Sequence, residues 1–148
     1  MEHVLRQYLE SSGAAARSAA LEQLTQFFAD AFARCFNVAA GRPVTIRLLD
    51  YPLHELGGTL ATEVNPMLGL RGVRQGVRWP ELYRAQIDAI MEAASGMDRQ
   101  ALPLADLEIM VPLVNYTDEV RLIQHWIDRS RDSKPAYRGL RVKLGAMV

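Results

Sequence analysis

A chain of 148 residues suits one domain, residues 1–148, with a hydrophobic core of its own. Its 17 basic residues balance 17 acidic ones, so no net charge favours nucleic acid or an acidic membrane surface as a partner. No apolar run approaches the roughly 18 residues of a membrane span, and the first residues lack the apolar core of a signal peptide, so we expect a cytoplasmic protein.

The first strong pattern predicts a helix over residues 18–40, where apolar residues recur three or four positions apart until Gly41. Cys35 lies among aromatic residues of this segment, which predicts a buried structural thiol. A single cysteine excludes an intrachain disulfide and a cysteine-based metal cluster, and the three histidines lack metal-binding spacing. We therefore expect no metal site built from these residues.

Residues 44–49 are apolar except at Thr45 and Arg47, a pattern typical of a strand covered on both faces. An arginine in such a strand costs free energy unless it is paired or binds a ligand. Prolines and glycines then predict a loop over residues 50–65. Residues 70–77 favour a short strand, although the glycines at positions 69, 72 and 76 weaken that pattern.

Pro80 begins a predicted helix that ends at Gly96, and residues 107–114 form a second apolar strand. A further helix begins near Thr117, and residues 140–148 form the last strand. Helices between strands predict an α/β fold with parallel strands. Ligands of such folds collect at the carboxyl ends of the strands, where Arg47, Asp50 and Asn115 would lie.

Residues 43–80 contain four arginines. Arg47 ends the first predicted strand, and Arg71 is followed at short spacing by Arg74 and Arg78. A guanidinium group binds carboxylate or phosphate oxygens through two parallel hydrogen bonds, so arginines gathered at strand ends predict an anionic ligand. The alternative is that several of them are solvated surface charges, which is the ordinary state of arginine.

Two motifs carry a resemblance to a known family. The chain contains R-L-L-D-x-P-L-H-E from Arg47 and N-P-M-L-G-x-R-G from Asn65, followed by LEIMVPLV at residues 107–114. These segments resemble the C-terminal phosphoenolpyruvate/pyruvate domain of pyruvate phosphate dikinase, and are more distantly similar to phosphoenolpyruvate synthase and Enzyme I of the sugar phosphotransferase system. The resemblance implies a (β/α)₈ TIM barrel of about 250 residues, of which this chain would be roughly the first half.

The resemblance also implies roles for individual residues. Arg47 and Arg71 would hold the phosphate of phosphoenolpyruvate, and Asp50 would orient neighbouring charge. The pair His54 and Glu55 matches the H-E of the first motif, with structural and catalytic roles both open. In the intact enzyme a swivelling phosphohistidine domain would exchange a phosphoryl group with enolpyruvate, its charge stabilised by the arginines and Mg²⁺. We count Asp50 and Asn115 as supporting residues.

Departures from the family pattern limit this expectation. The family's Mg²⁺-binding Glu follows a G-T-M-I-E strand, whereas this chain stops at Val148, one position before it. The second Mg²⁺ ligand and the cysteine that protonates the enolate would lie further on, and the first strand with its Arg would precede the chain. The segment from His54 to Asn65 is short, and Tyr51 stands where proline is usual. We therefore expect no tight Mg²⁺ binding and no activity of this chain alone.

A half barrel leaves strand edges and part of its core uncovered, which predicts a homodimer or a complementing chain. The first functional hypothesis is the phosphoenolpyruvate- and pyruvate-binding portion of a pyruvate phosphate dikinase-like phosphotransferase, acting with phosphohistidine and nucleotide-binding domains. The second is a stand-alone regulatory module that binds phosphoenolpyruvate. The third is a degenerate remnant whose arginines only hold the fold through ion pairs.

Overall fold

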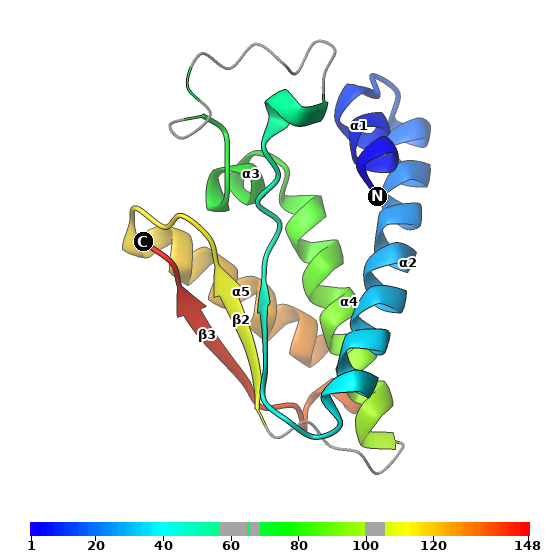
Figure 1. The fold of residues 1–148 in the computed structure, drawn as a ribbon, viewed down its shortest axis with the longest axis vertical. Coiled ribbons are helices and arrows are strands. Elements are labelled where there is room, and N and C mark those ends of the chain that lie inside the picture. The colour runs from blue at the N-terminus through cyan, green and yellow to red at the C-terminus, as the bar shows by residue number, and fades with distance from the viewer. Residues whose placement is uncertain (57–64, 66–68, 100–105) are drawn as a thin grey trace.

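The computed structural model describes residues 1–56, 65, 69–99 and 106–148. Within these residues the chain forms three strands, five α-helices and two short 3-10 helices, with helices before and between the strands (Figure 1). The element bounds, in chain order, are α1 Glu2–Glu10, α2 Ala14–Ala39, β1 Val44–Arg47, η1 Leu53–Leu56, α3 Val73–Arg78, α4 Pro80–Arg99, β2 Leu107–Val111, α5 Thr117–Ser133, η3 Pro135–Tyr137 and β3 Val142–Ala146.

The strands form one parallel sheet in the order β1-β2-β3. Val44 pairs with Leu107, and Leu107 pairs with Val142, so the strands start level with one another. Each crossover contains a helix, α4 after β1 and α5 after β2. This confirms the α/β class with parallel strands and flanking helices that the alternating pattern predicted.

The core lies between the sheet and its helices. In Figure 1, α5 passes behind the strands, α4 lies beside it, and α2 packs along α4 on the side away from the sheet. One apolar cluster joins the sheet to α4 and α5 through fully buried Ile87, Ile90, Ile109 and Ile123. A second joins α1, α2, η1 and α4 around Tyr8, Leu24 and Leu56. The helices therefore hold the sheet from one face.

The prediction that residues 44–49 form a strand covered on both faces is wrong. Ile46 is buried in β1, whereas Thr45 and Arg47 on the opposite face are exposed. On that exposed face the hydroxyl of Thr45 donates to Glu108 of β2 at 2.7 Å. Among the described residues only one face of the sheet is covered by helices, so buried and exposed residues alternate along β1.

Residues 70–77 do not form the predicted strand, because most of them belong to α3. Gly72 precedes this helix with φ = 56° and ψ = −134°, a conformation that glycine adopts without steric cost. One of the glycines that weakened the strand pattern, Gly72, thus marks the start of a short helix, and Gly76 lies within it. A helix in this position lets residues 72 and 73 approach the end of β2.

Cys35 also departs from expectation, since its side chain is exposed on α2. The neighbouring Phe32 and Phe36 pack toward the core, with Phe36 fully buried. Successive helical residues point 100° apart, so aromatic neighbours do not imply burial of the residue between them.

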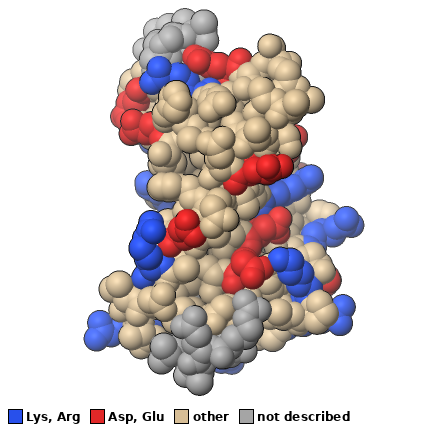
Figure 2. Space-filling view, turned by 90° about the vertical axis from the view of Figure 1, so that its right-hand side faces the viewer, with Lys and Arg blue, Asp and Glu red and all other residues tan. Residues whose placement is uncertain are grey.

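Charge is mixed over the face of the molecule that lies on the right of Figure 1. Figure 2 shows acidic and basic side chains interspersed there, with neither sign covering the surface. No helix among the described residues has both the length and the apolar character to cross a membrane.

Candidate functional site

A close ion pair lies where β1 ends. The guanidinium of Arg71 donates from Nε to Oδ1 of Asp50 at 3.1 Å and from Nη2 to Oδ2 at 2.9 Å. The backbone N–H of Gly72 donates to Oδ1 as well, at 3.0 Å. The side chain of Asp50 is 4% exposed and that of Arg71 is 19% exposed. One guanidinium edge is therefore fixed, while three of the five N–H groups of an arginine have no partner within the described ranges.

Backbone contacts bring this pair to the end of β2. Val73 N donates to the carbonyl of Pro112 at 2.9 Å. A Cβ added to Gly72 would lie 2.6 Å from the same carbonyl oxygen, so only glycine allows this approach. The carboxyl ends of β1 and β2 and the start of α3 thus meet in one place, toward which the strands point in Figure 1.

Side chains from α4 hold the backbone next to Asp50. The hydroxyl of Tyr83 donates to the carbonyl of Leu49 at 2.7 Å, and Leu49 N donates to Oε1 of Gln86 at 2.8 Å. Burial raises the pKa of Tyr83, the charge of Asp50 raises it further, and that of Arg47 lowers it. The hydroxyl of Tyr83, at the start of α4, thus holds the backbone of the residue next to Asp50.

A third polar side chain, Gln75 of α3, contacts the segments on either side of the pair. Its amide donates to the carbonyls of Tyr51 and Leu70, the latter at 2.9 Å. Sequence reasoning missed Gln75, Gln86 and Tyr83. The available signal was a glutamine in the apolar stripe of the helix after Pro80, because a polar residue on a buried face needs a hydrogen-bond partner.

Arg47 is the last residue of β1 and lies opposite Met110. It is exposed, and it forms no ion pair or hydrogen bond with the described residues. Its guanidinium is thus available to an anion, although no contact joins it to Arg71.

Asn115 follows β2 and is exposed. Its side-chain amide donates weakly to the carbonyl of Leu113 at 3.4 Å, and its backbone N–H donates to Glu119 at 2.8 Å. Asn115 therefore follows the end of β2, and its contacts are with its own loop and the first turn of α5 rather than with Asp50 or Arg71.

Arg74 and Arg78 lie beside this cluster. They line an open hollow of ≈ 400 Å³ together with Leu70, Val77 and Glu119. Nε of Arg74 donates to the carbonyl of Gly69 at 3.1 Å, and the guanidinium of Arg78 lies 5.7 Å from the ring centre of Trp79. Two further cations thus line a hollow that begins at Leu70, the residue before Arg71.

His54 lies in η1, and its Nδ1 is buried without a hydrogen-bond partner among the described residues. Residues 57–64, which follow it, are outside the described part of the chain. The structure thus leaves both roles of the His54 and Glu55 pair open.

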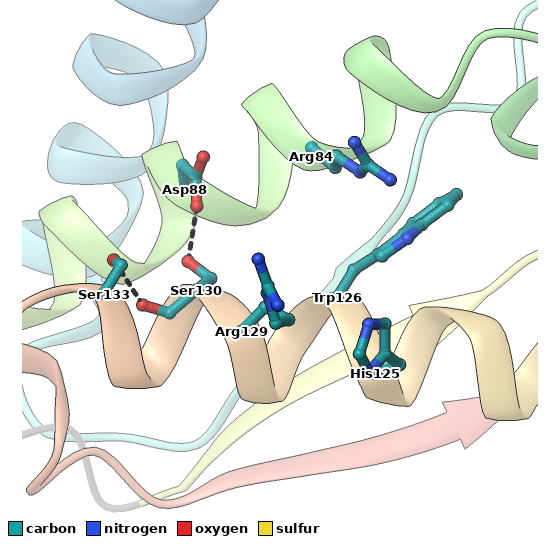
Figure 3. Close-up of a pocket in the computed structure, with 7 residues that line it drawn as sticks. All are labelled: Arg84, Asp88, His125, Trp126, Arg129, Ser130 and Ser133. Carbon is teal, nitrogen blue, oxygen red and sulfur yellow. Dashed lines mark hydrogen bonds between the residues drawn. The ribbon is translucent and has the colours of Figure 1, made fainter.

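A separate groove of ≈ 430 Å³ lies between the outer surfaces of α4 and α5 (Figure 3). Arg84 lies over the ring of Trp126, 5.1 Å from its centre, and the hydroxyl of Ser130 donates to Asp88 at 2.5 Å. This groove is larger than the hollow beside α3, yet side chains of α4 and α5 line it rather than residues at the strand ends, where ligands of parallel sheets bind. We therefore take the Asp50–Arg71 cluster as the candidate site.

No group of three or more His, Cys, Asp or Glu side chains within the described residues could hold a metal ion. Asp50, the acidic residue of the cluster, already accepts three hydrogen bonds from Arg71 and Gly72. The described side chains of this site suit an anion better than a cation.

Comparison with known proteins points to one family. Residues 10–148 match the model of the PEP-utilising enzyme, PEP-binding domain. The chain is 40% identical to a chloroplastic pyruvate, phosphate dikinase of Flaveria pringlei, over 71% of this chain and 14% of that protein. The enzymes of Rickettsia prowazekii and Giardia intestinalis are 35% and 33% identical, over 75% and 97% of this chain and 15% and 19% of theirs. The chain thus spans less than a fifth of these relatives.

Proposed function

The chain belongs to the family of the PEP-binding domain of PEP-utilising enzymes, and from this premise we propose that it is the phosphoenolpyruvate- and pyruvate-binding portion of a pyruvate phosphate dikinase-like phosphotransferase. Arg71 and Arg47 bind the phosphate, with Asp50 and Asn115 in support. The observation that carries the proposal is the guanidinium of Arg71, which is held along one edge by Asp50 and leaves its other N–H groups for a ligand.

The chemistry follows from charge. A phosphoryl group in transfer spreads negative charge over its three outer oxygens, and fixed guanidinium groups stabilise that charge without reorganising. Arg71 is held in place before a ligand arrives, whereas Arg47 is exposed and would order on binding. The two arginines would bind one phosphate from two sides, with Asp50 acting on Arg71 rather than on a proton of the substrate.

Mg²⁺ serves the intact enzymes of this family. The described residues do not fit that ion, because none of their acidic side chains form a group that could hold it and Asp50 is committed to Arg71. We therefore derive no step through a metal. Weak or absent Mg²⁺ binding, and binding of phosphoenolpyruvate without turnover by these 148 residues alone, stay predictions.

We further propose that the sheet is part of a (β/α)₈ barrel, with β1, β2 and β3 as consecutive strands. Their sequential order, parallel direction and helices on one face support this. The exposed face with Thr45, Arg47 and Glu108 would then face the barrel interior. A complementing chain or a second copy would cover that face, and phosphohistidine and nucleotide-binding domains would supply the phosphoryl group.

One observation favours the remnant hypothesis as the second candidate. The pair of Arg71 with Asp50 is the kind of ion pair that would hold the fold without a ligand. Arg47 distinguishes the phosphate-binding proposal from the remnant hypothesis. It has no ion-pair partner among the described residues, so an effect of its removal on ligand binding cannot come from a lost ion pair that holds the fold.

Calorimetric titration with phosphoenolpyruvate, with and without Mg²⁺, tests the proposal. We expect the parent to bind and Arg47→Ala to bind at least tenfold more weakly, since a charge-assisted hydrogen bond contributes about 1.5–3 kcal/mol. Arg121→Ala is the matched control, because Arg121 is also exposed and its ion pair is with Asp118 of α5, away from the strand ends in sequence. Equal affinities of the parent and Arg47→Ala would exclude Arg47 as a ligand, and no binding by the parent at millimolar ligand would favour the remnant.

A further inference from the structure

Gln75 is a buried polar residue that the proposed function does not yet use. Its side chain is 2% exposed, within the first turn of α3. The amide is well satisfied: Nε2 donates to the carbonyls of Tyr51 and Leu70, and Oε1 accepts from Tyr51 N at 3.3 Å. A buried amide with three backbone partners fixes the positions of all three.

Those partners adjoin the two residues of the ion pair. Tyr51 follows Asp50 directly, and Leu70 directly precedes Arg71. The two segments are 21 positions apart in the sequence, and both rest against α3 through the same side chain. A change at Gln75 would therefore alter the distance between the segments that carry Asp50 and Arg71.

We infer that Gln75 is a positioning residue for binding of the ligand's phosphate. By holding the segments that carry Asp50 and Arg71, it fixes the position of the Arg71 guanidinium that would contact the phosphate. This inference rests on the proposed function. A bidentate arginine contact tolerates displacements of only about half an ångström, so a small shift of either segment weakens binding without unfolding the chain. The hydrogen bonds of the Gln75 side chain are with Tyr51 and Leu70, so its effect on Arg71 passes through those segments.

A role in folding alone would also explain a buried glutamine. The two explanations differ in what happens when Arg71 can no longer make its two-point contact. If Gln75 acts only on folding, its substitution should cost the same free energy of unfolding in the parent and in Arg71→Lys. If it acts on ligand affinity through the guanidinium, its effect on affinity should vanish in Arg71→Lys.

The test compares the parent with Gln75→Met, which keeps the length of the side chain and removes all three hydrogen bonds. Ser95→Ala is the control, since Ser95 is equally buried at 2% exposed and donates to a backbone carbonyl of Glu92 on α4. Gln75→Glu, which keeps the oxygen and removes both N–H donors, replaces the methionine variant if that variant does not fold.

We expect Gln75→Met to raise the dissociation constant for phosphoenolpyruvate about tenfold, the effect of one lost hydrogen bond at the ligand. Ser95→Ala should change it less than twofold, and Gln75→Met should add less than a twofold loss in the Arg71→Lys background. An unchanged dissociation constant in Gln75→Met, or the same loss in both backgrounds, would overturn the inference.

A measurement without ligand separates this inference from the proposed function. The Nε–H proton of Arg71, assigned in nitrogen-15 NMR spectra by its loss in Arg71→Lys, should exchange slowly with water in the parent because it binds Asp50. Gln75→Met should speed that exchange at least fivefold, and Ser95→Ala should not. If the parent fails to bind phosphoenolpyruvate, the proposed function fails, and the exchange rate alone decides whether Gln75 positions Arg71.

Discussion

The carboxylate of Asp50 and the guanidinium of Arg71 meet edge to edge, with contacts of 3.1 and 2.9 Å, although 21 positions separate them in the sequence. Asp50 is the more buried partner, at 4% exposed against 19% for Arg71. Removal of either residue leaves the other charge without its partner inside the protein. Substitution of Arg71 therefore changes stability as well as binding, whereas substitution of exposed Arg47 reports on binding alone.

Asp50→Asn should destabilise the chain by about 2–4 kcal/mol, because a buried charge pair loses one member. Phosphoenolpyruvate binding should weaken as well, since the guanidinium of Arg71 is no longer aligned. Urea denaturation followed by circular dichroism measures the first effect. Asp118→Asn is the control: its pair with Arg121 is largely exposed, so we expect a change below about 1 kcal/mol. Equal effects of the two substitutions would show that Asp50 is not committed to Arg71.

Gly76→Ala should destabilise the chain by about 1–3 kcal/mol, as expected for overpacking. A Cβ at this position would lie 2.4 Å from Cδ2 of Tyr83, whose hydroxyl holds the carbonyl of Leu49. Thermal unfolding measures the effect, with Gly139→Ala as the control because nothing lies within 4 Å of its Cβ position. A melting temperature equal to that of the parent would mean that Tyr83 packs elsewhere in solution.

Tyr83→Phe should change how stability depends on pH. The folded chain raises the pKa of Tyr83 above its ordinary value of 10.0, chiefly through burial. The neutral hydroxyl therefore contributes stability that is complete below pH 10 and is lost as pH rises, because only the unfolded chain releases the proton there. The parent should lose about 1.4 kcal/mol per pH unit relative to Tyr83→Phe above pH 10.

Denaturant titrations of the parent and Tyr83→Phe at pH 8, 10.5 and 11.5 measure this difference. At pH 8 the parent should be the more stable by about 1 kcal/mol, the contribution of one hydrogen bond to Leu49. Parallel pH profiles of the two proteins would show that Tyr83 titrates normally and is not held in the core.

Cys35 should react with a water-soluble disulfide reagent in the native chain, since its side chain is exposed on α2. We expect one thiol per chain to react without denaturant, at the rate of a small-molecule thiol. Cys35→Ser should shift stability by less than about 0.5 kcal/mol, as for other exposed positions. If the thiol reacts only in denaturant, Cys35 is buried in solution, as the sequence predicted.

The sequence alone determined the α/β class of the fold and the order of its longer helices and strands. Helical spacing before Gly41 and after Pro80, and apolar runs at residues 44–49 and 107–114, were enough because hydrophobic periodicity is a local property. It failed where local signals were ambiguous. The glycines before residue 77 weaken a strand, yet Gly72 permits the start of α3. The aromatic neighbours of Cys35 gave no information on the direction of its side chain.

The motifs and strand ends predicted that Arg47, Asp50 and Arg71 belong to one anion site, and ligand binding there stays a prediction. Only the tertiary structure decided that Asp50 takes one edge of the Arg71 guanidinium, that Arg47 has no such partner among the described residues, and that Gln75 joins the segments beside the pair. Such contacts depend on separations of a few ångströms between residues far apart in sequence. Periodicity places residues on elements, but the packing of those elements on α3 and α4 sets which polar groups meet.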